Sequence, residues 1–245
     1  MCYGPEVRTV FECINRGYAS STTELKTILQ YKDEGDISSL VDSVITFLKD
    51  LDLIDQKEKK ITSLVAEWNV IQVFKKINQI SKRSDSESLN YIFTNLFDHL
   101  FVKPNRMFVS NLHYHVNSSF SKTIVGHEKI NAWKRIMEYM GLGRRVYSGF
   151  YGLPQLNLMK DIVCSEPSWE GSLHHFCETV INPIIPCITN EDKVYNGILF
   201  SLVALSEVGC ISISHKQDLP FKSYGPNLEW NWINVGGEKS ASLLN

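Results

Sequence analysis

The chain has 245 residues, of which 43% are hydrophobic, and its 25 Lys and Arg nearly balance its 27 Asp and Glu. This length and composition suit a globular protein of one large or two to three small domains. Proteins that bind DNA unaided usually carry a basic footprint over a whole domain, and a net charge of −2 leaves room only for a local basic surface. The longest apolar run, 198–205, is too short to span a bilayer, and the six scattered cysteines favour reduced thiols, so we expect a cytoplasmic protein with no membrane partner.

The N-terminal part predicts three helices and a hairpin. Apolar residues recur every three or four positions between Ile37 and Leu51, which indicates a helix with one buried face. Two shorter helices are predicted over 5–16 and 22–29, and a charged turn over 55–60 followed by an alternating segment predicts a β-hairpin. Residues 1–65 are therefore interpreted as an N-terminal winged-helix unit.

Charge on the third predicted helix bears on what this unit binds. Winged-helix proteins that read DNA insert this helix into the major groove. Residues 36–54 hold four acids and one base, which opposes the approach of phosphate. Docking of a protein is therefore favoured over base recognition, although Lys57, Lys59 and Lys60 in the hairpin are candidates for phosphate contact.

The middle of the chain, 66–188, is predicted to be helical. Helices are expected over 66–80, 89–101, 108–120 and 128–139, and the last is followed by a glycine-containing turn and a strand that alternates through Phe150. Helix, turn and strand repeat the layout of the first unit. We therefore expect a degenerate winged-helix copy within this middle part.

The C-terminal part repeats the layout again. A helix over 194–207 ends at Gly209, a strand begins at Ile211, and a second strand returns through 230–235. Residues 189–235 are thus interpreted as a winged-helix-like unit, and 236–245 as a flexible tail. The expected fold class is mainly α with small β-hairpins (α+β), with winged-helix units at both ends joined by a helical middle.

A basic segment is the strongest candidate for contact with nucleic acid. Between residues 122 and 145 the sequence holds six basic and two acidic residues. Arginine in a glycine-rich turn can reach phosphate or a partner carboxylate, but a solvated helix face explains the pattern equally well. The candidate contacts are Lys122, Lys129, Lys134, Arg135, Arg144 and Arg145.

Signals for chemistry are weak. His174 and Cys177 have a helical spacing that can hold zinc, but no Cys-x-x-Cys pair accompanies them, which favours a structural role; His113 and His115 are interpreted as surface or interface residues. The P-loop, GxSxG, HExxH and GxGxxG motifs do not occur. We therefore expect a protein that is not an enzyme, with no catalytic residue, metal, cofactor or small-molecule substrate.

With helix-and-hairpin units at both ends and near-neutral charge, the chain resembles the small tandem winged-helix (KITE) and kleisin-like accessory subunits of SMC-type ATPases. The run WKRIMEYMGLG within 127–151 is also similar to the small third subunit of Lamassu-type bacterial defence systems against phages and plasmids. These resemblances imply a non-enzymatic scaffold that docks a larger ATPase or nuclease subunit and contacts DNA weakly or only within the complex. The alternatives are a winged-helix transcriptional regulator and a nuclease or hydrolase without a recognised motif.

Overall fold

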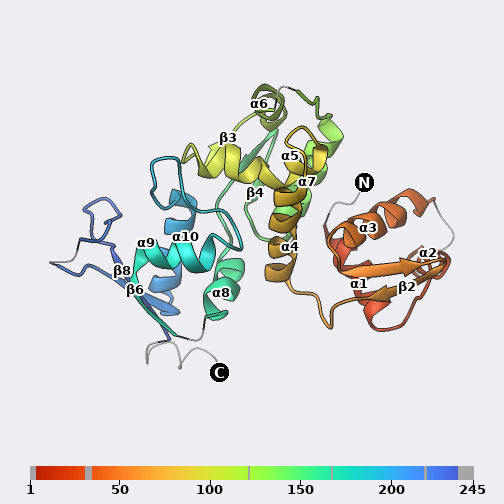
Figure 1. Cartoon of the computed structure of the whole chain (residues 1–245), viewed down its shortest axis with the longest axis horizontal. Helices are drawn as coiled ribbons and strands as arrows, with labels where there is room; N and C mark the ends of the chain where they lie inside the picture. Colours follow the sequence, from red (N-terminus) through yellow and green to blue (C-terminus); the bar gives the residue numbers. More distant parts are fainter. Residues whose placement is uncertain (1–3, 31–34, 121, 167, 218–219, 237–245) are drawn as a thin grey trace.

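A computed structural model describes residues 4–30, 35–120, 122–166, 168–217 and 220–236. Helices alternate with three small antiparallel sheets, so the fold is mixed α+β. In Figure 1 the N-terminal unit lies on the right, the C-terminal elements lie on the left, and helices of the middle part lie between them. Apart from Gly236, the predicted flexible tail lies outside the described residues.

The N-terminal unit contains the three helices and the hairpin that the sequence predicts. Its elements are α1 (Pro5–Asn15), α2 (Thr22–Leu29), α3 (Ser38–Asp50), β1 (Ile54–Lys57) and β2 (Lys60–Ser63). The inward face of α3 follows the predicted spacing, with Val41, Val44 and Leu48 buried among α1, α2 and β1. Glu58 turns the hairpin with a φ of 54°.

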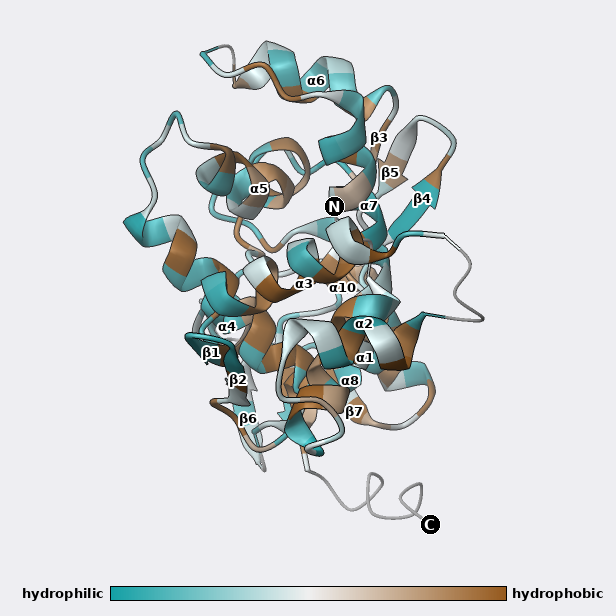
Figure 2. Ribbon diagram, turned by 90° about the vertical axis from the view of Figure 1, so that its right-hand side faces the viewer, coloured by the Kyte–Doolittle hydropathy of each residue, from teal (hydrophilic) through white to brown (hydrophobic). Residues whose placement is uncertain are grey.

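The middle part begins with α4 (Val70–Arg83) and α5 (Leu89–Phe97), and α5 continues as a short π-helix, η1 (Asp98–Val102). Figure 2 shows hydrophobic and hydrophilic bands alternating along α4, as expected of a helix with one buried face. The remaining elements are β3 (Phe108–Val109), α6 (Leu112–Ser119), α7 (His127–Tyr139), β4 (Arg144–Val146) and β5 (Gly149–Tyr151).

Two predictions for this part were wrong in detail. The helix expected over 108–120 begins only at Leu112, because Phe108 and Val109 pair with β5 as a strand. The single strand expected through Phe150 is a hairpin, since Val146 pairs with Gly149 across a turn. Both differences produce one three-stranded sheet of order β3-β5-β4.

The C-terminal part contains a second three-stranded sheet, of order β6-β8-β7. Its elements are α8 (Leu156–Cys164), β6 (Trp169–Ser172), α9 (Leu173–Phe176), the π-helix η2 (Cys177–Ile181), α10 (Asn196–Glu207), β7 (Ile211–Ser214) and β8 (Trp232–Val235). The predicted hairpin of β7 and β8 is confirmed. Because β8 also pairs with β6, the sheet crosses the domain boundary that the sequence placed at residue 189.

If each π-helix is counted with the helix that it continues, the middle part from α5 onward and the C-terminal part share one order of elements: helix, strand, helix, helix, strand, strand. In both, the last strand lies between the other two. The N-terminal unit has the same order without a first strand among the described residues. From α5 onward, the middle part therefore contains the same set of elements as the C-terminal part.

Contacts between the three parts join their cores. The ring centroids of Phe47 on α3 and Phe93 on α5 lie 6.0 Å apart, as do those of Phe97 and Tyr195. Asn78 on α4 donates to the carbonyl of Ile184 at 2.9 Å. Among the described residues, no helix combines the length and hydrophobicity needed to cross a bilayer.

Candidate nucleic-acid interface

The hairpin of β4 and β5 is held firmly against the core by Phe150. This side chain is fully buried, with its ring centroid 5.1 Å from that of Trp133 and 5.8 Å from that of Phe101. Two glycines allow the strands to approach. A Cβ on Gly143 would lie 2.1 Å from the carbonyl oxygen of Tyr151, and one on Gly149 would lie 2.4 Å from that of Val109.

Arg144 and Tyr147 are two exposed side chains of the hairpin. Arg144 lies on the edge strand β4 and is exposed, and it forms no ion pair with any residue that the structure describes. Tyr147 occupies the turn with a φ of 49°, and 98% of it is exposed. Exposed cations and exposed rings are the side chains with which proteins contact the phosphates and stack on the bases of single-stranded nucleic acid.

Arg145 is partly neutralised. Its backbone N–H donates to a carboxylate oxygen of Glu138 at 2.9 Å, and its guanidinium pairs with the same carboxylate. Glu138 lies in the last turn of α7, so this contact fixes the hairpin relative to the helix. The exposed face of the helix carries Lys129 and Arg135, both exposed.

Lys134 does not belong to this exposed face. Only 6% of it is exposed, and its Nζ donates to the carbonyl of Tyr147 at 3.4 Å. Burial lowers the pKa of this ammonium group, and the nearby charge of Arg145 lowers it further. The prediction that Lys134 contacts nucleic acid is therefore corrected. Its side chain holds the tip of the hairpin to α7 and does not face solvent.

Lys122 lies apart from the hairpin and pairs with Glu87, in the segment between α4 and α5. The lysines of the N-terminal hairpin are exposed, and Lys57 approaches Asp55 at 3.6 Å. Lys59 and Lys60 follow Glu58 in the same turn. Of the sequence candidates on α7 and β4, Lys129, Arg135, Arg144 and Arg145 are exposed and Lys134 is buried. These four exposed residues define the α7–β4 face.

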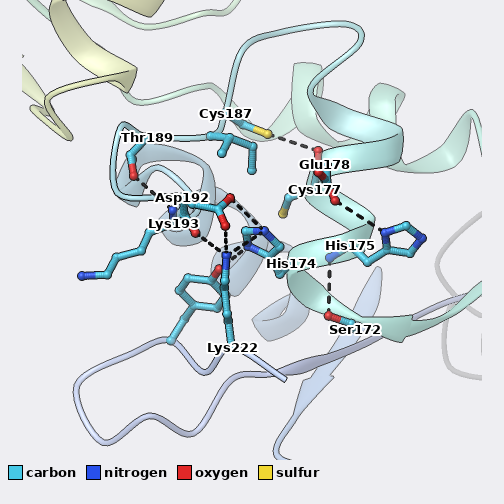
Figure 3. A network of polar contacts seen from close by, with 12 residues as sticks. Ser172, His174, His175, Cys177, Glu178, Cys187, Thr189, Asp192, Lys193 and Lys222 are labelled. Carbon is cyan, nitrogen blue, oxygen red and sulfur yellow. Dashed lines mark hydrogen bonds and ion pairs between the residues drawn. The ribbon is translucent and has the colours of Figure 1, made fainter. Parts of the chain in front are cut away.

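A second polar cluster lies in the C-terminal part (Figure 3). The Nδ1 of His174 lies 2.5 Å from the hydroxyl of Tyr224, and its Nε2 lies 3.5 Å from the Asp192 carboxylate, which pairs with Lys222. Burial lowers the pKa of His174, and the charge of Lys222 adds to that effect. These contacts fasten the long connection between β7 and β8 to α9 and to the turn at Asp192.

The thiols near this cluster are protonated, and its described residues form no group that could hold a metal ion. Cys177 and Cys187 are buried and burial raises the pKa of both thiols, so neither supplies a thiolate at neutral pH. Within the described ranges, no group of three or more His, Cys, Asp and Glu side chains is placed to hold a metal ion. The partners of His174 are distant in the sequence: Asp192 is 18 residues away, Lys222 is 48 and Tyr224 is 50. No local sequence pattern could therefore have predicted these contacts.

His113 and His115, which were predicted to lie at the surface or in an interface, have different surroundings. His113 stacks on His127 at the start of α7, with ring centroids 3.5 Å apart and planes inclined by 12°. His115 instead makes an edge contact with Tyr114. Neither arrangement gathers further metal ligands among the residues that are described.

No protein-family model matches this sequence, and no curated protein or solved structure is significantly similar to it. What the chain does must therefore be inferred from its own residues.

Proposed function

We propose that this chain is a non-enzymatic adaptor subunit of a multi-protein complex that acts on DNA. In this proposal the three repeated parts are winged-helix units, the larger partner is an SMC-type ATPase or a nuclease, and the α7–β4 face contacts DNA weakly. A bacterial defence complex against phages or plasmids is the setting in which we place it. The described cysteines are unpaired, which suits the reducing cytoplasm.

The observation that carries the proposal is that one repeated layout exposes three different surfaces. The third helix of each part differs in charge: α3 has one base and two acids, α7 has two acids and three bases, of which Lys134 is buried, and α10 has a single acid. On α10, Phe200 is 52% exposed, and Val208, which follows its end, is 50% exposed. A basic face suits phosphate and an apolar one suits protein docking, so one chain can join DNA to a protein.

A winged-helix transcriptional regulator is the second candidate, favoured by the exposure of Lys129, Asn131 and Arg135 on α7. The two proposals differ in whether the isolated chain binds duplex DNA. A regulator shifts a specific duplex without partners, whereas an adaptor purified from its native host retains a large ATPase or nuclease and binds duplex DNA poorly by itself. Specific, tight binding by the isolated chain would overturn the adaptor proposal.

Charge reversal tests the α7–β4 face within the complex. We expect the double variant Arg144→Glu, Arg145→Glu to bind DNA at least tenfold more weakly and to lower the salt dependence of log K by about two, since each lost phosphate contact removes about 0.9 from the slope. The matched control is Lys75→Glu, Lys82→Glu on α4, which changes net charge equally at exposed positions outside the face. Equal losses in both variants, with unchanged circular dichroism, would remove this face as the DNA contact.

A further inference from the structure

A hydrophobic hollow lies beside α7, and Lys129 of the α7–β4 face is among its lining residues. It has a volume of about 470 Å³ and opens between α3, α4, α5 and α7. Its floor reaches the core, because these four helices line it with buried side chains. They are Leu51, Ile77, Ile92, Leu96, Ile130 and Trp133.

Three polar groups that line this hollow already donate hydrogen bonds within the protein. The indole N–H of Trp133 already donates to the carbonyl of Phe93 at 2.9 Å. The hydroxyls of Thr46 and Thr94 donate to carbonyls of their own helices, both at 2.9 Å. At the mouth, Leu89 remains 37% exposed. Water beside the apolar part of the lining has few polar partners, so an apolar ligand gains free energy by displacing it.

One exposed carboxylate lies at the mouth. Asp50, at the end of α3, lines the hollow and makes no hydrogen bond or ion pair with any described residue. Partial burial raises the pKa of the Asp50 carboxyl, and the nearby charge of Lys49, whose Nζ donates to the side chain of Gln56 at 3.4 Å, offsets part of that effect. A cation placed beside Asp50 would gain a charge-assisted contact. Lys129, which also lines the hollow, is exposed.

We propose that this hollow binds a small amphipathic amine, with its apolar body among Phe47, Phe93 and Trp133 and its ammonium group paired with Asp50. The volume lies within the range of about 300–1,000 Å³ that small organic ligands occupy. A compact ligand fits better than a partner helix, because the space extends inward to core residues of four helices and not along the surface of one. Because α3 and α7 both line the hollow, such a ligand would also tie the N-terminal unit to the α7–β4 face.

The test uses the full chain and a fluorescent apolar probe, N-phenylnaphthylamine. We expect saturable binding of this probe, and displacement by decylammonium at about tenfold lower concentration than by decyl sulfate, since a charge-assisted contact contributes about 1.5 kcal/mol or more. Asp50→Asn should abolish the preference for decylammonium while leaving probe binding intact. Asp161→Asn, at an exposed position on α8, is the matched control and should behave as wild type.

A second variant tests the location. Ala132 is 6% exposed and lines the hollow from α7, so Ala132→Phe should fill the space and eliminate probe binding. If that variant does not fold, Thr46→Phe at the exposed rim makes the same test. A wild-type chain that shows no saturable binding, or a folded filled variant that binds the probe normally, would overturn the site. Equal displacement by the two detergents below their micellar concentrations, or preference for the sulfate, would overturn the assignment to amines.

Discussion

Replacing Phe150 by alanine should destabilise the protein strongly, because this residue anchors the hairpin that carries Arg144. Phe150 is fully buried, and its ring contacts those of Trp133 and Phe101. Removal of a buried phenylalanine costs about 3–5 kcal/mol through lost burial and the cavity that remains. For a chain of 245 residues, a loss of about 4 kcal/mol corresponds to a fall in Tm of about 8–16 °C.

The neighbouring Tyr151 provides the control, since successive residues of a strand point to opposite faces. Tyr151 is 38% exposed and stacks only loosely on Phe108, with ring centroids 5.5 Å apart. Tyr151→Ala should therefore cost about 1 kcal/mol or less. Thermal and urea unfolding followed by circular dichroism measure both variants. If Tyr151→Ala destabilises as much as Phe150→Ala, the register that pairs Phe150 with Val109 and Arg145 is refuted.

Three other outcomes test separate parts of the fold. Leu48→Asp should unfold the N-terminal unit, because it places a charge at a position with no exposure, and an unchanged melting temperature would contradict the orientation of α3. Lys134→Met should be more stable than wild type near neutral pH, because burial lowers the pKa of Lys134 in the folded state. The free energy of unfolding of the wild type therefore rises as the pH increases from that lowered pKa toward the ordinary lysine value. Thermal melts at increasing pH should show the difference in stability between the two proteins becoming smaller. Ellman's reagent should label the exposed thiol of Cys164 in the native protein, but it should label the buried thiols of Cys177 and Cys187 only after unfolding. Mass spectrometry that finds either buried thiol labelled in the native protein would contradict their burial.

Local patterns predicted the elements whose partners are near in sequence. Helix α7 differs from its predicted range by one residue, because the apolar spacing in that segment is regular. The β1–β2 hairpin was predicted because its strands adjoin one turn. In contrast, β6 was missed, since it pairs with β8 more than 60 residues later and its sequence, WEGS, has no apolar alternation.

The sequence could identify the basic residues of the candidate interface but not their contacts. Lys134 lies four residues after buried Ile130, a spacing that places it on the inward side of α7, so this signal was available in the sequence. The pairing of Arg145 with Glu138 depends on how the hairpin folds back onto the helix, which no local pattern specifies. The hollow beside Asp50 requires four helices to converge, and their arrangement is set by tertiary packing alone.

The number of cations on the α7–β4 face limits how tightly this chain can hold DNA by itself. The face holds four exposed cations, Lys129, Arg135, Arg144 and Arg145, so at most about four phosphates can be neutralised even if every one of them contacts DNA. Four contacts give a salt slope of about −3.6, and affinity then falls only about 150-fold between 50 and 200 mM salt, whereas proteins with about 6–10 phosphate contacts lose about 10³–10⁵. A face of this size contributes to binding when a partner supplies further contacts, which is what an adaptor subunit requires.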